Sequence, residues 1–335
     1  MKSTLSALGR LAAVLSLLLA APALAAPEGA TPAERRIISL YAAHTEVLLR
    51  LGARDNLVGV SAQESYQGPE TAGWQPRVFS PRDDVEKFLA ARPDLVLLRP
   101  MHLASNRQLA AALRRAGIKV LARQVQKSGE LYAYWRELGA LVGREAEAEA
   151  LIAGFDRQVA LYRAAADRRP KADRPGVFLE AIHSQVKTFT PDSLPAWLVE
   201  LAGGRNVAAD AKPQAPGLII ADYGPERLLA RAGEVDIFIS QDGPMNRAGL
   251  KQILRRPVYQ PLAAFKTGRV YKISEAVLAR PTPALLEGLR ELARLTGLEA
   301  DGPPAAAAEE APPAASEPAP PSASEPAPPS APEPD

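Results

Sequence analysis

The three histidines of this chain are its best-suited side chains for binding a metal, and their positions are similar. His44, His102 and His183 each come shortly after an apolar run that predicts a buried strand. Because ligands of open α/β sheets bind beyond the carboxyl ends of the strands, we expect all three to face one cleft. Imidazole binds iron, including haem iron, so all three are candidate metal ligands. Ordinary loop histidines, bonded to backbone or water, are the alternative.

Other candidate ligand-binding side chains lie near the same predicted strand ends. The guanidinium groups of Arg99 and Arg280 suit carboxylate, catecholate or phosphate oxygens, which they can bind with two hydrogen bonds. Solvated surface arginines are the alternative. The side chains that could join a metal site or pack against a macrocycle are Tyr41, Tyr66, Trp74, Phe79 and Met101.

Catalytic patterns are missing from the sequence. It contains no Gly-x-Ser-x-Gly elbow, no phosphate-binding loop, no Gly-x-Gly-x-x-Gly and no His-Glu-x-x-His. Carboxylates are plentiful, so an acid pair acting on a glycoside stays open. We nevertheless expect a binding protein rather than an enzyme, with no intrinsic cofactor.

The middle of the chain contains an internal repeat. Residues 48–58 (LLRLGARDNLV) resemble 198–208 (LVELAGGRNVA), and residues 86–90 (EKFLA) resemble 226–230 (ERLLA), in the same order. The offset is far longer than a solenoid period of about 20–50 residues. We expect two lobes of similar construction with a cleft between them. Chance similarity in a sequence rich in Ala, Leu and Arg is the alternative.

The order of predicted elements supports an α/β fold. Short apolar strands at 36–40, 57–60, 94–98 and 118–121 alternate with helices, and the pattern resumes at 177–182. Between them, apolar residues at helical spacing predict one long helix over 144–168. We therefore expect two doubly wound lobes with mainly parallel sheets, at 36–128 and 171–300, joined by a helical bridge at 129–170.

The ends of the chain predict export. Residues 1–25 have a positive start, an apolar run and small residues before the cleavage point, which indicates a signal peptide cleaved after Ala25 or Ala26. Residues 26–35 form a short lead, and the Pro/Ala/Ser/Glu-rich segment 301–335 predicts a disordered tail. The chain has no cysteine, so no disulfide can form. We expect a periplasmic monomer without a membrane span when mature.

Charge narrows the choice of partners only slightly. The chain has 40 basic and 38 acidic residues, and the C-terminal tail contains seven of the acidic residues and no basic one. The remaining core is mildly basic, which suits an anionic small ligand. No dense block of Lys and Arg with interleaved aromatic residues indicates nucleic acid.

From residue 36 to residue 297 the sequence resembles the periplasmic binding proteins that deliver iron chelates and cobalamin to ABC importers. The segments that carry the resemblance are 36–40, 45–48, 51–53, 57–61, 85–86, 92–96, 201–206 and 266–271. It departs from the family pattern at residues 41–44 and 65–69, which line the cleft in that family. The identity of the ligand is therefore the weakest inference from the resemblance.

The resemblance implies a function and a partner. It implies a two-lobed protein that holds a ferric siderophore or haem between its lobes, with cobalamin as the alternative, and passes it to a dimeric membrane permease. A sensor or structural module on the same fold is a further alternative. Glu86 and Glu226 match the family positions where one glutamate of each lobe pairs with permease arginines. Both also lie at the start of a predicted helix, where the helix dipole favours a carboxylate. This capping role is the alternative to docking.

Overall fold

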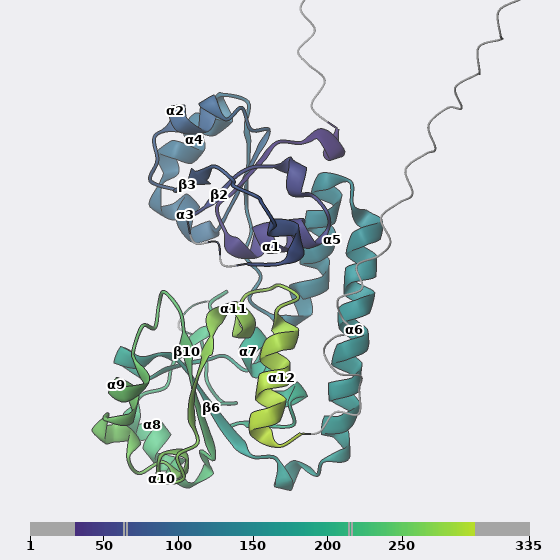
Figure 1. The fold of residues 1–335 in the computed structure, drawn as a ribbon. Coiled ribbons are helices and arrows are strands. Elements are labelled where there is room, and N and C mark those ends of the chain that lie inside the picture. The colour runs from purple at the N-terminus through teal and green to yellow at the C-terminus, as the bar shows by residue number, and fades with distance from the viewer. Residues whose placement is uncertain (1–30, 63, 65, 214, 216, 299–335) are drawn as a thin grey trace, which may run out of the picture.

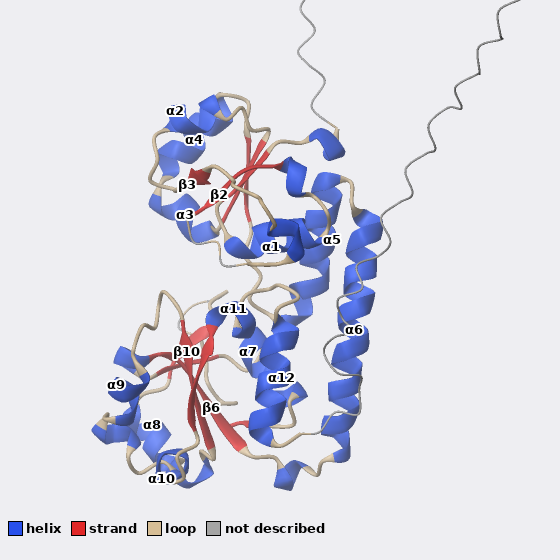
Figure 2. Cartoon of the chain, viewed as in Figure 1, coloured by secondary structure: helices blue, strands red, loops and turns tan. Residues whose placement is uncertain are grey.

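The computed structural model describes residues 31–62, 64, 66–213, 215 and 217–298. Two α/β lobes are joined along one side by the long helix α6 (Glu145–Arg168) (Figure 1). Each lobe has its own sheet flanked by helices (Figure 2). The predicted architecture of two α/β lobes with one bridging helix is confirmed. The predicted signal peptide at 1–25, part of the predicted lead at 26–35 and the predicted tail at 301–335 lie outside the described residues.

The sheet of the N-terminal lobe is parallel throughout, in the order β3-β2-β1-β4-β5. Its strands are β1 (Ile37–Ser39), β2 (Leu57–Ser61), β3 (Val78–Phe79), β4 (Leu95–Leu98) and β5 (Lys119–Ala122). Its helices are α1 (Ala42–Arg50), α2 (Val85–Ala90), α3 (Pro100–Ser105) and α4 (Arg107–Arg115). The central strands β1 and β4 are buried along their whole length, as their continuous apolar sequences require.

The sheet of the C-terminal lobe is mixed, in the order β11-β10-β6-β7-β9, with β8 beside β6. Its strands are β6 (Gly176–Ile182), β7 (Lys187–Phe189), β8 (Arg205–Asn206), β9 (Ile220–Asp222), β10 (Ile237–Asp242) and β11 (Val270–Ser274). Its helices are α7 (Leu194–Leu201), α8 (Pro225–Ala230), α9 (Leu250–Leu254), α10 (Ala263–Lys266), α11 (Glu275–Leu278) and α12 (Leu285–Thr296). β7 is antiparallel to β6 because the chain reverses in a short turn, where Val186 has a positive φ of 50°.

The bridge consists of two helices packed against each other. Helix α5 (Leu131–Val142) ends at Gly143, whose φ of 66° allows the left-handed turn that stops it. Helix α6 then runs from Glu145 to Arg168, one residue shorter than predicted, and buries an apolar stripe that includes Ile152, Phe155 and Val159. In the described part of the chain, no helix combines the length and apolarity needed to cross a membrane.

The two lobes share a continuous apolar core. Its buried residues come from strands β1 and β4 of the first lobe, from α5 and α6, and from β6, α7 and α12 of the second lobe. Trp135 of α5 lies in the middle of this core and donates a hydrogen bond from Nε1 to the carbonyl oxygen of Pro281, 2.9 Å away. The contact between the lobes is therefore packed like a protein interior.

Close packing of α12 makes one glycine sensitive to substitution. A Cβ at Gly288 would lie 2.1 Å from the carbonyl oxygen of Val277, whereas a Cβ at Gly154 in α6 would approach only the guanidinium group of Arg157, at 3.8 Å. We expect Gly288→Ala to lower the free energy of unfolding by about 1–3 kcal/mol. Gly154→Ala should raise it by about 0.5–1 kcal/mol, because Ala favours the helix. Urea denaturation measures both, and equal effects would contradict the packing described for α12.

Candidate functional site

The predicted arginines Arg99 and Arg280 come from different lobes and lie near the same tyrosine. The guanidinium carbon of Arg99 lies 4.9 Å from the ring centroid of Tyr41, and its Nε donates to Gln124 at 3.0 Å. Arg280 donates from Nε to Glu275 Oε1 at 3.2 Å. Burial raises the pKa of Tyr41 to about 12, although both arginines act to lower it. The structure thus brings three predicted site residues together between the lobes.

A buried carboxylate that the sequence analysis missed lies at the same interface. Glu64 accepts hydrogen bonds at Oε1 from Thr45 and Ser61, each at 3.0 Å, while its Oε2 is buried without a hydrogen-bond partner. Burial raises the pKa of Glu64 to about 7, and the hydrogen bonds and Arg280 only partly offset this effect. Glu64 lies in a loop after β2, where no sequence pattern marks a residue as buried.

His44 lies inside the N-terminal lobe rather than in a loop. Helix α1 begins at Ala42, earlier than the predicted start near residue 45, so His44 belongs to the helix and is fully buried. Its Nδ1 lies 2.7 Å from the hydroxyl of Tyr134, and its Nε2 has no hydrogen-bond partner. Burial lowers the pKa of His44 to about 4, so it is neutral. The expectation that His44 faces the cleft from a loop is wrong.

Met101 and His102 lie on the short helix α3, which the sequence analysis did not predict. Met101 is 56% exposed. His102 is half-buried, its Nδ1 has no hydrogen-bond partner, and burial together with the nearby Arg99 lowers its pKa. A large apolar side chain and a neutral imidazole thus lie side by side just after β4.

Two of the four aromatic candidates, Phe79 and Tyr66, have local partners. Phe79 is buried and packs against Phe88, with ring centroids 5.1 Å apart, so it belongs to the core of the N-terminal lobe. This burial contradicts the expectation that its ring is open to a ligand. Tyr66 donates its hydroxyl proton to Glu70 at 2.6 Å, and the guanidinium carbon of Arg50 lies 4.7 Å from its ring centroid.

His183 is held by a buried carboxylate at the end of β6. Its Nδ1 lies 3.0 Å from Glu180 Oε1, and Glu180 also accepts hydrogen bonds from the hydroxyls of Tyr259 and, at 2.7 Å, Ser240. Ser240 in turn accepts from Asn246 at 3.0 Å. Because Glu180 accepts all of these hydrogen bonds, the Nδ1 atom of His183 carries the proton. The lone pair on Nε2 of His183 is therefore available to another partner. Glu180 within an otherwise apolar strand was the sequence signal for this group.

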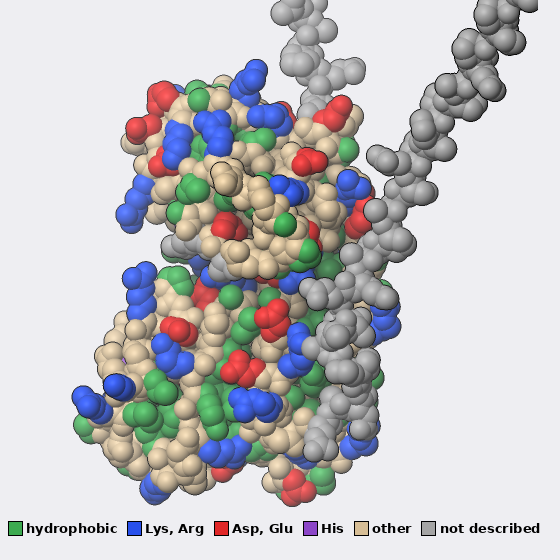
Figure 3. Space-filling view, in the orientation of Figure 1, with side chains coloured by type: hydrophobic (Ala, Val, Ile, Leu, Met, Phe, Trp, Pro, Cys, Tyr) green, Lys and Arg blue, Asp and Glu red, His purple; other side chains and the backbone are tan. Residues whose placement is uncertain are grey.

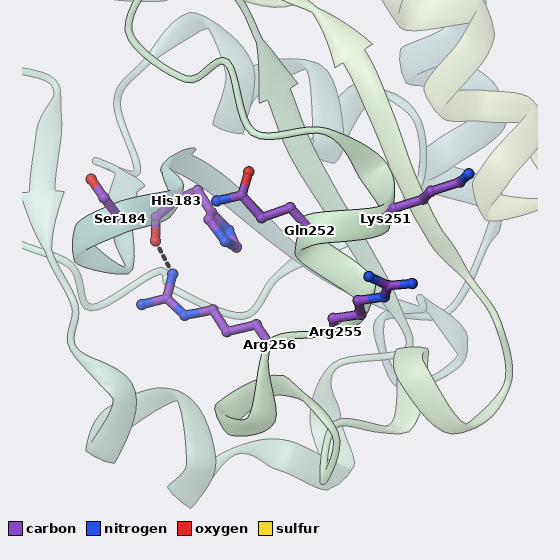
Figure 4. A pocket seen from close by; sticks show the side chains of 6 residues that line it. All are labelled: His183, Ser184, Lys251, Gln252, Arg255 and Arg256. Carbon is purple, nitrogen blue, oxygen red and sulfur yellow. Dashed lines mark hydrogen bonds between the residues drawn. The ribbon is translucent and has the colours of Figure 1, made fainter.

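A cavity of about 650 Å³ opens beside His183 (Figure 4). It is lined by His183, Ser184, Lys251, Gln252, Arg255 and Arg256. The guanidinium group of Arg256 donates to the carbonyl oxygen of His183, whereas Lys251 and Arg255 are exposed. The cavity therefore combines an oriented imidazole with three cations, a combination that suits an anionic ligand. The sequence analysis predicted His183 but missed the cations on and just after α9.

Glu86 and Glu226 occupy the second position of α2 and of α8. Both carboxylates are exposed, and neither forms an ion pair or hydrogen bond with another residue in the described ranges. Figure 1 places α2 and α8 at the outer ends of their lobes, away from the bridging helix. Their exposure leaves both carboxylates available for a contact with another protein, and their place in the first turn also suits the helix dipole.

Among the described residues, no three or more His, Asp or Glu side chains gather in a way that could hold a metal ion. The three histidines are not brought together. His44 is in the interior of the first lobe, His102 is on α3, and His183 is on the second lobe. A metal bound here by one of them must therefore bring other ligands with it.

The chain belongs to the periplasmic binding protein family, whose model matches residues 37–277. It is similar to an uncharacterized ABC transporter substrate-binding lipoprotein of Bacillus subtilis, with 26% identity over 77% of this chain and 79% of that protein. It is 30% identical to a vitamin B12-binding protein of Yersinia pseudotuberculosis over 68% of this chain and 75% of the relative. The resemblance inferred from the sequence is thus confirmed.

The fold comparison agrees. A crystal structure described as a possible iron-binding, periplasmic solute-binding protein of Staphylococcus epidermidis aligns with a TM-score of 0.65 and 26% identity, over 78% of this chain and 98% of that one. The family consists of substrate-binding components of transporters rather than enzymes.

The raised pKa of Glu64 predicts a pH-dependent stability. Between pH 4.5, which is the usual pKa of glutamate, and about pH 7, the folded protein keeps a proton on Glu64 that the unfolded chain loses. Stability should therefore fall as pH rises through this window, by about 1–3 kcal/mol, and then level off. Glu64→Gln should remove this part of the pH dependence, measured by urea denaturation at pH 5 and pH 8. The exposed Glu145→Gln is the control, and equal pH dependence in wild type and Glu64→Gln would contradict the assignment.

Proposed function

We propose that this protein captures an anionic metal chelate and delivers it to an ABC importer in the bacterial envelope. The single observation that carries the ligand class is the His183–Glu180 pair beside a cavity lined by cations. Membership of the periplasmic binding protein family supports the transport role. Export through a signal peptide cleaved near Ala25 and a monomeric state are parts of the same proposal.

His183 is proposed as the residue that contacts the metal. Ligating histidines commonly donate their other ring nitrogen to a carboxylate, which fixes the tautomer and the orientation of the ring. Glu180 supplies that carboxylate, and it is itself fixed by Tyr259 and Ser240. Since one histidine cannot hold a free ion, the metal should arrive in a chelate with an open or exchangeable position, as haem iron does.

The charges around the cavity favour acidic ligands. Lys251 and Arg255 are exposed, and neither forms an ion pair with another described residue. Carboxylates of haem or an acidic siderophore would neutralise them, whereas cobalamin offers mainly amides. We therefore place a ferric siderophore or haem ahead of a cobamide. Cobalamin remains the second candidate because a vitamin B12-binding protein is among the relatives.

Ligand titration tests the proposed chelate. The protein without its signal segment is titrated with haem, ferric siderophores and cobalamin, following tryptophan fluorescence and ligand absorbance. If haem binds, His183→Ala should abolish the absorbance change of axial coordination, and Glu180→Gln should weaken binding by about 10–100-fold. His102→Ala is the matched control and should bind as wild type. Failure of all three ligands to bind would overturn the ligand class.

Transport assays test the proposed docking residues. Exposed ion pairs contribute mainly orientation and encounter rate, so the contact should be weak and sensitive to salt. The double variant Glu86→Lys, Glu226→Lys should keep its fold and ligand affinity but lose transport of the ligand into cells. Exchange of the exposed Glu145 for Lys should have no effect. Wild-type uptake by the double variant would refute the role of the two glutamates.

A further inference from the structure

Helices α2 and α8 present the same surface, residue by residue. In both, the second and third positions are exposed, the fourth is fully buried, and the fifth and sixth are exposed again. The buried positions are Phe88 and Leu228. Each helix then exposes a leucine, Leu89 at 39% and Leu229 at 38%. An exposed leucine alone needs no explanation, but the same exposed leucine at the repeated position of both lobes does.

Each of these leucines lies beside the free glutamate of its helix. Glu86 and Leu89, like Glu226 and Leu229, are three residues apart and so share one face of a helix. The basic residue between them is already paired within its own lobe. Lys87 binds Asp83 at 2.6 Å, and Arg227 binds Asp210 at 2.8 Å.

The two faces are therefore alike in chemistry. Each presents an unpaired carboxylate beside an apolar side chain. The neighbouring basic residue already forms an ion pair with an aspartate of the same lobe. A face of this kind fits a cationic group next to an apolar socket. Since the faces are duplicated, the fitting partner presents that socket twice, as a dimer of identical subunits does.

We propose that Leu89 and Leu229 are the apolar anchors by which the two lobes dock onto the two subunits of the importer permease. This inference rests on the proposed transport function and adds the residues that supply affinity. Exposed ion pairs contribute little binding free energy, whereas burial of an exposed leucine side chain removes apolar surface from water and contributes more. Glu86 and Glu226 set orientation, and the leucines set the lifetime of the complex. Figure 1 shows both helices on the side of their lobes away from α6, so a single partner can meet both.

The test compares the double variant Leu89→Ser, Leu229→Ser with a matched control, Leu218→Ser, Leu254→Ser. The control leucines are similarly exposed, at 45% and 42%, and lie outside the two helices. The partner is an ABC importer reconstituted in nanodiscs and selected because the unmodified protein stimulates its ATPase rate. Binding is measured at 50 and 300 mM salt, and thermal melting checks that each variant is folded.

We expect the docking variant to bind at least about tenfold more weakly at both salt concentrations, with its ligand affinity unchanged. The control should bind like wild type, and Leu89→Met, Leu229→Met should recover most of the affinity. By contrast, exchange of Glu86 and Glu226 for Gln should reduce the salt dependence of binding.

Two results would separate this inference from the function on which it rests. If the unmodified protein stimulates an importer but the serine variant binds as tightly as wild type, the leucine anchors are wrong while the transport function stands. If the control and docking variants lose the same affinity for the importer, the loss is caused by the added surface polarity alone, and the proposal is overturned. If no importer responds to the unmodified protein, the proposed function fails, and the inference fails with it.

Discussion

The packing of Trp135 between the lobes is the contact on which the rest of the structure depends. Its indole is fully buried, lies 5.0 Å from the ring of Phe155 on α6, and donates to the Pro281 carbonyl of the other lobe. Burial of a tryptophan side chain contributes on the order of 3 kcal/mol or more, and its N–H must find a partner once buried. One side chain thus fixes α5, α6 and the loop before α12 in a single arrangement.

That arrangement explains why charged groups can lie between the lobes. Arg280, one residue before Pro281, is placed by the same loop, and it pairs with Glu275 while acting on Tyr41 and Glu64 across the interface. A buried guanidinium is tolerated only with such partners. The notch between the lobes in the space-filling view lies on the side away from α6 (Figure 3).

The sequence predicted elements whose signals are local and missed features that depend on tertiary context. The apolar stripe of α6 follows from periodicity, and the repeat around Glu86 and Glu226 predicted two matching helices. Strands β7 and β9 are only three residues long, so no alternation could mark them. Burial of Glu64 and of His44 is decided by neighbours distant in sequence, such as Tyr134 for His44.

The residues proposed for ligand binding and those proposed for docking lie on different parts of the molecule. Residues proposed to meet the ligand lie where β6 ends, while the glutamates and leucines of α2 and α8 lie at the outer ends of the lobes. Because one continuous core joins lobes and bridge, little hinge motion is available to report that a ligand is bound. The proposed docking and capture sites are therefore separate surfaces of one stiff body. A partner that holds both outer ends at once can move the lobes apart only by working against the packing around Trp135, so any separation of the lobes would draw its energy from the partner rather than from the binding protein.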